Sequence, residues 1–349
     1  MTKNIVSTLC SGGMEFFELA FILSPYIVVN YGLIKGLMLV KHKVGIEQII
    51  AQISEQWRND DDLSKQQKYK KKALLKSLNW GNTTFYWITS LSTIQYLFTP
   101  LIKKMICDFK GIEDCEWLLP FACSYPIDMS TNLFVYGFLY VHQVYWAIIG
   151  ISMYQGVELL LYALCGHLSS QFVLLQEDLL HVNVNKKSAA NDRSGHLTLH
   201  DIIKKHQLLT GFSKELDNIF NKIIFGNMFF ATITIGMFGF VAKFSHGLSD
   251  MLNNFVGATA SIIPIYNLCY YAQLLSDSSG DIADAAYKNH WWKSDRAFRT
   301  CICIIIARAQ KPCFLTSLGY APVTLNTFAR VLSNTWSYFS LMISAYEEK

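Results

Sequence analysis

The residue types that catalyse reactions are present in this sequence, but they do not occur in catalytic patterns. There is no GxSxG elbow, no phosphate-binding loop, no HExxH pair and no dinucleotide-binding glycine pattern. His200 and His206 lie in a basic segment that we interpret as solvated surface. Cys301 and Cys303 have no partner at ligand spacing, so we expect buried thiols. The sequence predicts no enzyme, no catalytic residue, no metal site and no cofactor.

The terminal helix offers a different chemistry. From Phe328 onward apolar residues alternate with small hydroxyl and amide residues, and Arg330 is the only charge before Glu347. One apolar face and one face of hydroxyls and amides suit the wall of a pore that is packed against other helices. Taken alone, the pattern favours an ordinary packed helix at the end of a domain. The rest of the chain decides between the two.

The composition places that helix in a membrane. Of 349 residues, 52% are hydrophobic and only 16% are charged. Apolar stretches of membrane-spanning length recur, too many for one buried core. The sequence therefore predicts an all-α, polytopic transmembrane helical bundle in the lipid bilayer, as one domain over residues 1–349. It predicts cytosolic helical extensions and loops at 41–82, 167–206 and 276–300.

Basic residues set the expected orientation. Lys and Arg concentrate after the first, third and fifth apolar stretches, and the positive-inside rule puts those segments in the cytosol. Both chain ends are then expected outside. An outside N-terminus without a signal peptide is unusual, so we expect that a preceding span is missing from this chain.

Two further features within this frame carry chemistry. Glu158, in the third stretch, is an acid of the kind that carries ions or protons in membranes, but we expect it near the cytosolic end and wetted there. Cys107, Cys115 and Cys123 lie in one inter-span loop. A disulfide fits if that loop faces an oxidising space, and a fully reduced set fits equally well.

Aromatic and hydroxyl residues concentrate in the extracytosolic halves of the apolar stretches. Helix packing and an interfacial aromatic belt account for about half of them. The others predict a concave, mostly apolar pocket with a few hydroxyls, suited to a small volatile or lipid-like ligand. The candidate pocket residues are Phe17, Phe21, Tyr96, Thr99, Tyr136, Tyr140, Phe230 and Thr259.

Three sequence blocks resemble the insect odorant receptors, and the resemblance covers nearly the whole chain. The most specific block is C-terminal and comprises Arg308–Cys313, Leu318–Phe328 and Ser337–Met342. A second block comprises Cys269–Ser279, Ala286–Tyr287 and Trp291–Trp292, and a weaker third comprises Leu119–Phe121 and Tyr125–Asp128.

The resemblance implies seven spans with a cytosolic N-terminus, of which this chain would hold six, lacking the N-terminal tail and first span. The last helix would be split and would line a pore over residues 323–346. The family further implies an odorant-gated, non-selective cation channel, built as a heterotetramer with a common co-receptor. Its ligand would be a volatile odorant or pheromone, and its location the plasma membrane of olfactory-neuron dendrites, with no nucleic-acid partner.

On this sequence, the resemblance places the hydrophobic gate at Leu341 and a polar position one turn further out at Ser344. Ser340 and Tyr338 belong to the same pore segment, and we expect Tyr338 to pack rather than conduct. A ring of aliphatic side chains at Leu341 can close a pore by dewetting.

Two other classes remain as alternatives. A gustatory receptor of the same superfamily would end in Thr-Tyr, three hydrophobic residues and Gln-Phe, and this sequence departs from that ending after Tyr338. A secondary transporter would have two similar halves with Gly- or Pro-broken spans at matching positions, and the sequence has neither.

Overall fold

The computed structural model describes residues 16–111, 117–121, 125, 133–182, 198–245 and 247–347. These ranges are almost entirely helical. The α-helices are α2 (Phe16–Lys41), α3 (Lys43–Glu55), α4 (Lys65–Phe109), α5 (Leu133–His181), α6 (Leu199–Phe244), α7 (Leu248–Lys288), α8 (Arg296–Ala309) and α9 (Leu325–Glu347). The short elements are the 3-10 helices η1 (Asp60–Asp62) and η2 (Trp291–Lys293) and the strands β1 (Thr316–Ser317) and β2 (Ala321–Pro322).

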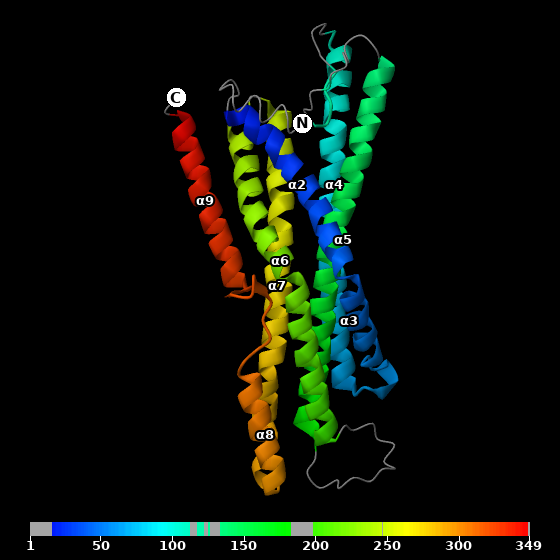
Figure 1. The fold of residues 1–349 in the computed structure, drawn as a ribbon, viewed down its shortest axis with the longest axis vertical. Coiled ribbons are helices and arrows are strands. Elements are labelled where there is room, and N and C mark those ends of the chain that lie inside the picture. Colours follow the sequence, from blue (N-terminus) through cyan, green and yellow to red (C-terminus); the bar gives the residue numbers. More distant parts are fainter. Residues whose placement is uncertain are drawn as a thin grey trace.

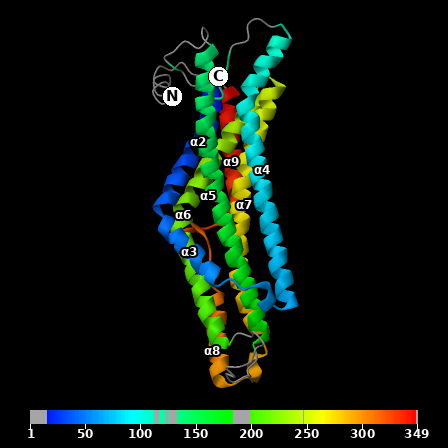
Figure 2. The same cartoon turned by 90° about the vertical axis from the view of Figure 1, so that its right-hand side faces the viewer.

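The long helices run side by side along the longest axis of the molecule (Figure 1). Helix α5 packs against α2, α4, α6 and α7, while α9 packs against α6 and α7. Helix α8 lies against α7 at the end of the bundle opposite to the free end of α9 (Figure 1). Figure 2 shows that α2 begins at the same end at which α9 finishes. The described part of the chain therefore begins and finishes at the same end of the bundle.

The helices are long enough to cross a bilayer and continue beyond it. Helix α5 has 49 residues, which makes it about 70 Å long, against a hydrocarbon core of about 30 Å. Among the described helices, three combine the length and apolar composition of a membrane span, and these are α2, α5 and α6. Helices α4 and α7, with 45 and 41 residues, are as long but more polar on average. The predicted all-α polytopic bundle is confirmed.

The polar segment predicted between the third and fourth spans is shorter than expected. The loop was expected from His167 to His206, but α5 continues to His181 and α6 begins at Leu199. Leu168, Phe172 and Leu175 follow one another at helical spacing and are fully buried, so the apolar stripe of α5 continues into this segment. Helix α6 begins at a capping box in which the Thr198 hydroxyl accepts from the Asp201 backbone N–H.

The hydrophobic core is divided unequally between the two halves of the bundle. Its main cluster joins α5, α6, α7 and α8 and contains fully buried side chains such as Tyr162, Phe172 and Phe220. A much smaller cluster, Ala20, Phe240 and Val241, lies near the start of α2 and packs against α9. The half of the bundle that contains α8 is therefore close-packed, and the other half has room for a cavity.

The last helix of the bundle is split, as predicted. Helices α8 and α9 are separated by the antiparallel pair β1–β2, whose turn places Leu318 at φ 54° and Gly319 at φ 80°. Asp217 of α6 holds this hairpin, because its carboxylate accepts from the Thr316 backbone N–H at 2.6 Å and from the Thr316 hydroxyl at 2.9 Å. Helix α9 is thus attached to α6 at its base.

Candidate functional site

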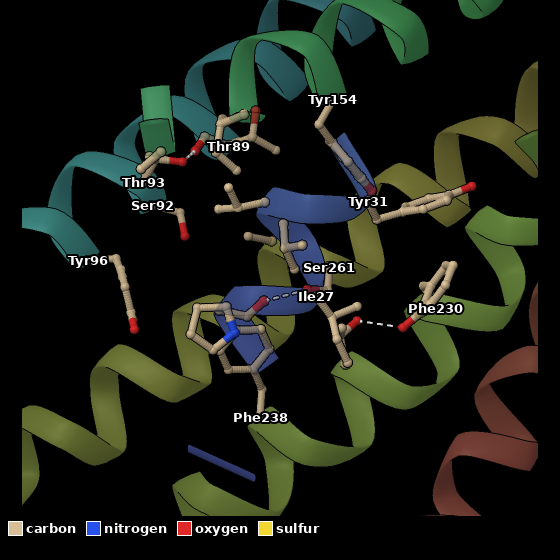
Figure 3. A pocket seen from close by; sticks show the side chains of 18 of the residues that line it. Ile27, Tyr31, Thr89, Ser92, Thr93, Tyr96, Tyr154, Phe230, Phe238 and Ser261 are labelled. Carbon is tan, nitrogen blue, oxygen red and sulfur yellow. Dashed lines mark hydrogen bonds between the residues drawn. The ribbon is translucent and has the colours of Figure 1, made fainter. Parts of the chain in front are cut away.

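A cavity of about 110 Å³ lies between α2, α4, α5, α6 and α7, in the loosely packed half of the bundle (Figure 3). A buried apolar cavity of about 150 Å³ holds benzene, so this volume belongs to the size range of small volatile molecules. The lining used in the arguments below consists of Tyr31, Thr89, Ser92, Thr93, Tyr96, Tyr154, Gln155, Asn227, Phe230, Thr234, Phe238, Asn253 and Ser261.

Helical spacing brings the lining residues of α4 and α6 onto single faces. On α4, Thr89, Thr93 and Tyr96 follow at intervals of four and three residues. On α6, Asn227 and Thr234 are separated by seven residues, with Phe230 between them. Both patterns keep side chains on one side of a helix. These stripes are the sequence signal that would have located the cavity on both helices.

The polar groups of the cavity are largely bound to their own helices. The hydroxyls of Thr93 and Thr234 donate to the carbonyls of Thr89 and Phe230 at 2.8 and 2.9 Å. The Thr89 hydroxyl donates to the Phe85 carbonyl and accepts from the Gln155 amide at 2.7 Å. None of the described lining residues is charged. This arrangement suits an uncharged, mostly apolar ligand.

Two of the predicted pocket residues line this cavity, Tyr96 and Phe230. The other predicted residues are not part of its lining. Thr99 and Thr259 lie on exposed surfaces, and their hydroxyls donate to carbonyls of their own helices. Phe17 packs beside Phe240 and α9, and Phe21 is partly exposed.

Tyr136 and Tyr140 are buried next to the cavity wall and hold it together. The Tyr136 hydroxyl donates to the Leu118 carbonyl at 3.0 Å, and the Tyr140 hydroxyl donates to the Leu97 carbonyl of α4. Their rings lie 5.8 Å apart between centroids. Both hydroxyls therefore tie α5 to neighbouring backbone instead of facing a ligand.

A buried ion pair lies beside the cavity and overturns the expectation for Glu158. Glu158 is 1% exposed rather than wetted, and it pairs with Lys35 of α2, which is 0% exposed. The Lys35 ammonium lies 4.8 Å from the ring centroid of Tyr31 and 3.6 Å from that of Tyr154. Asn227 of α6 donates to the Glu158 carboxylate at 2.7 Å. Pairing allows both charges to leave water.

Lys35 was not predicted as a partner of Glu158, although the sequence contains a signal for it. Lys35 lies inside the first apolar stretch, and Glu158 lies inside the third. Two opposite charges in separate membrane stretches are each expensive alone, which makes their pairing the expected arrangement.

The four residues of the predicted pore segment lie on one exposed side of α9. Leu341, Ser344, Ser340 and Tyr338 are exposed in this chain, and the Leu341 side chain retains 65% of its surface. The opposite side of the helix, with Phe339 and Met342, packs against α6. This side of α9, with one large aliphatic residue among hydroxyls, is therefore not covered by any other part of the described chain.

A disulfide at Cys107 excludes the fully reduced set of cysteines that the sequence had left open. Cys107, at the end of α4, is disulfide-bonded. The other described cysteines are free, and of the two thiols expected to be buried, Cys301 is only partly buried and Cys303 is exposed. Cys115 and Cys123, the two candidate partners that the sequence offers in the same loop, lie outside the described residues.

Comparison with known proteins identifies the fold and the family. Residues 15–336 match the family described as 7tm odorant receptor. The chain belongs to this odorant receptor family. Odorant receptor 92a of Drosophila melanogaster is 29% identical over 286 residues, covering 82% of this chain and 69% of that protein. Odorant receptor 85b of the same species is 23% identical over 349 residues, covering 96% and 84%.

Solved structures agree on the fold of this odorant receptor. The insect olfactory receptor OR5 from Machilis hrabei, in complex with eugenol, superposes with a TM-score of 0.76 over 92% of this chain and 81% of that one, at 13% identity. The structure of the same receptor described without eugenol gives a TM-score of 0.74. The resemblance to insect odorant receptors and the multi-pass membrane fold that were inferred from sequence motifs are confirmed.

Proposed function

We propose that this odorant receptor is the ligand-binding subunit of an odorant-gated, non-selective cation channel. It assembles as a heterotetramer with a common co-receptor in the plasma membrane of olfactory-neuron dendrites. Its ligand is a small volatile odorant or pheromone that occupies the cavity between α2, α4, α5, α6 and α7. The uncharged, largely apolar lining supports this ligand class. The capture of eugenol by the related OR5 supports a small organic ligand.

The observation that carries this proposal is that α6 contacts both the cavity and α9. Asn227, Phe230 and Thr234 of α6 line the cavity. Farther along the same helix, Phe240 and Val241 pack against α9. At Gly236 the two helices are close, since a methyl group there would lie 3.2 Å from Cε of Met342. A ligand that displaces α6 therefore displaces the helix proposed to line the pore.

In this mechanism the ligand acts through its differential affinity for two positions of α6 and α9. Each tenfold preference for the open arrangement shifts gating by about 1.4 kcal/mol. In the closed arrangement, the Leu341 side chains of the assembled subunits meet and exclude water. Outward movement of α9 separates them, and the hydroxyls of Ser340 and Ser344 then line a wet path.

The cytosolic segments 41–82, 167–206 and 276–300 form the anchor that holds the subunits together in this proposal. An ionic network makes this region rigid within the chain. Arg58 pairs with Asp178 of α5 at 2.5 Å, and Gln67 donates to the same carboxylate at 2.7 Å. Lys71 pairs with Asp60 at 3.0 Å. A rigid anchor lets the opposite half of each subunit move.

Whole-cell recording tests the proposal. Cells that express this chain with the co-receptor are exposed to a broad panel of volatiles, and cells with either subunit alone serve as controls. We expect cation-selective, ligand-evoked current that requires this chain. A pair that reaches the cell surface and gives no current contradicts the channel assignment, and saturable uptake without current would indicate a transporter instead.

A further inference from the structure

The cavity has one end that holds a buried hydrogen-bond acceptor without a partner among the described residues. This end, which we call the acceptor end, is formed by Tyr31, Tyr154 and Asn227. In Figure 3 Tyr31 and Tyr154 lie on one side of the cavity, and Ser92 and Tyr96 lie on the other. Asn227 is only 3% exposed, and its Oδ1 atom has no hydrogen-bond partner among the described residues. A buried, unpartnered carbonyl oxygen calls for a donor.

The ion pair fixes the direction in which the Asn227 carbonyl points. Glu158 is paired with Lys35, so its carboxylate only accepts hydrogen bonds. The amide nitrogen of Asn227 must therefore face Glu158, to which it donates at 2.7 Å. Turning the amide over would bring two oxygen atoms together. Oδ1 is consequently held away from Glu158.

The hydroxyls of Tyr31, Thr234 and Ser261 do not supply the missing donor. The Tyr31 hydroxyl donates to the Ile223 carbonyl at 2.8 Å. The Thr234 hydroxyl, two turns further along α6, donates to the Phe230 carbonyl at 2.9 Å. Across the cavity, the Ser261 hydroxyl donates to the Gly257 carbonyl at 2.9 Å. None of these three hydroxyls donates to Asn227, so a molecule inside the cavity can supply the donor.

We propose that Asn227 is a specificity-determining residue that accepts a hydrogen bond from the hydroxyl of a small, uncharged alcohol or phenol. Glu158 and Lys35 are positioning residues that orient its amide. This inference rests on the proposed function, because it names the ligand class of that same cavity. An ammonium ligand is disfavoured, since Glu158 is already neutralised by Lys35. Oδ1 has almost no surface open to water, so a ligand hydroxyl that moves the lining aside gains a hydrogen bond there, whereas an ether does not.

Pairs of isomers that differ in the donor alone test the proposal. The full chain is reconstituted in lipid nanodiscs, and affinities are measured by thermal stabilisation. The probes are 1-hexanol against methyl pentyl ether, and p-cresol against anisole. We expect each alcohol or phenol to bind about tenfold more tightly than its isomer, as one added hydrogen bond allows. Equal affinities within both pairs, or no binding of any probe, would overturn the proposal.

Variants assign the preference to Asn227. In Asn227→Leu we expect the two isomers of a pair to bind within about twofold, while the ether keeps its affinity and so reports an intact cavity. Asn254→Leu removes a buried amide of α7 that does not line the cavity and serves as the matched control, with the tenfold preference retained. Glu158→Gln, which loosens the amide without removing it, should lower the ratio partway. A full preference in Asn227→Leu contradicts the assignment.

The binding readout separates this inference from the channel proposal. Selective binding of the alcohols without evoked current in the whole-cell assay leaves the acceptor end established and refutes the proposed gating. Evoked current with equal responses to both isomers supports the channel and refutes the role of Asn227.

Discussion

Gly32 of α2 and Gly150 of α5 face each other so closely that a methyl group on Gly32 would overlap the Gly150 carbonyl oxygen. A methyl group on Gly150 would lie 2.6 Å from Cγ1 of Val29 and 2.9 Å from its carbonyl oxygen. In membranes, small residues allow helices to approach until their backbones touch. This contact adjoins the cavity, because Val29 and Tyr31 line it, and so it fixes how far α2 stands from α5.

We expect Gly32→Ala to destabilise the receptor by about 3 kcal/mol, because the methyl group meets backbone rather than a flexible side chain. Thermal unfolding of the purified protein measures the loss. Gly156→Ala is the matched control, since a methyl group at that position of α5 meets nothing within 4 Å. There the higher helix propensity of alanine should leave stability unchanged or raise it slightly. Equal effects of the two substitutions would contradict the close approach.

Breaking the Lys35–Glu158 pair should harm the fold more than removing it. Lys35→Met leaves the Glu158 carboxylate buried without its counter-charge, which typically costs about 3–5 kcal/mol. The double variant Lys35→Met, Glu158→Leu removes both charges and should recover most of that loss. Thermal unfolding of Lys35→Met, of Glu158→Leu and of the double variant gives the coupling free energy between the two side chains. Additive effects would mean that the two side chains act independently.

His206 of α6 was expected to be solvated but is 6% exposed, and its burial should make the protein less stable in acid. Burial, with the nearby Arg308 charge, lowers the pKa of His206 to about 4. The unfolded chain keeps a pKa near 6.5, so it binds more protons between these values. Stability is then full above pH 6.5 and falls by about 3 kcal/mol as the pH drops to 4.

The measurement is the unfolding free energy against pH for the receptor and for His206→Gln. The variant should lose the decrease that His206 contributes below pH 6.5. His200→Gln, at an exposed position at the start of α6, should keep the full decrease. Parallel curves for the receptor and His206→Gln would exclude His206 as the cause.

Asp217 should matter more than Thr316 to the attachment of α9. Thr316→Val removes only the hydroxyl that donates to the carboxylate, whereas Asp217→Ala also leaves the Thr316 backbone N–H without its acceptor. We expect losses of about 1 and about 3 kcal/mol respectively. Limited proteolysis between α8 and α9 compares the two variants, and faster cleavage in Thr316→Val than in Asp217→Ala would contradict the ranking.

Leu341→Ala should raise the basal current of the proposed channel with the co-receptor, because a smaller side chain narrows the pore less and resists wetting less. Whole-cell current without ligand measures the effect. Trp336→Ala, at another exposed position of α9, provides a control for general damage to the helix. An unchanged closed-state current with normal surface expression would remove Leu341 from the gate.

Sequence reasoning reached the fold and family because both depend on extended patterns. Long apolar stretches and the C-terminal motif around Leu318–Phe328 need no tertiary information to be recognised. It was harder to predict from the sequence which side chains face the cavity. Tyr140 carries an aromatic ring and a hydroxyl at the right depth, yet its hydroxyl donates to the Leu97 carbonyl. Depth alone does not reveal which face of a helix points at a neighbouring backbone.

The prediction that Glu158 is wetted was wrong for a related reason. Its environment depends on Lys35, a residue 123 positions away in sequence, and on the α2–α5 contact that brings the two together. Asn227 has no sequence signal of its own, but its seven-residue spacing from Thr234 does indicate a shared face. The environments of these side chains depend on contacts between helices that are distant in sequence. Local propensities do not reveal such contacts.

The unequal division of the core also bears on how this receptor can change over evolutionary time. The close-packed half around Tyr162, Phe172 and Phe220 supplies most of the buried apolar surface. Most cavity residues lie outside that cluster, so we expect substitutions among them to alter the proposed ligand preference while leaving foldedness nearly intact. Residues that stabilise the fold and residues that would set the ligand preference therefore lie at opposite ends of the same helices. A change in the preferred odorant would then not require a different fold.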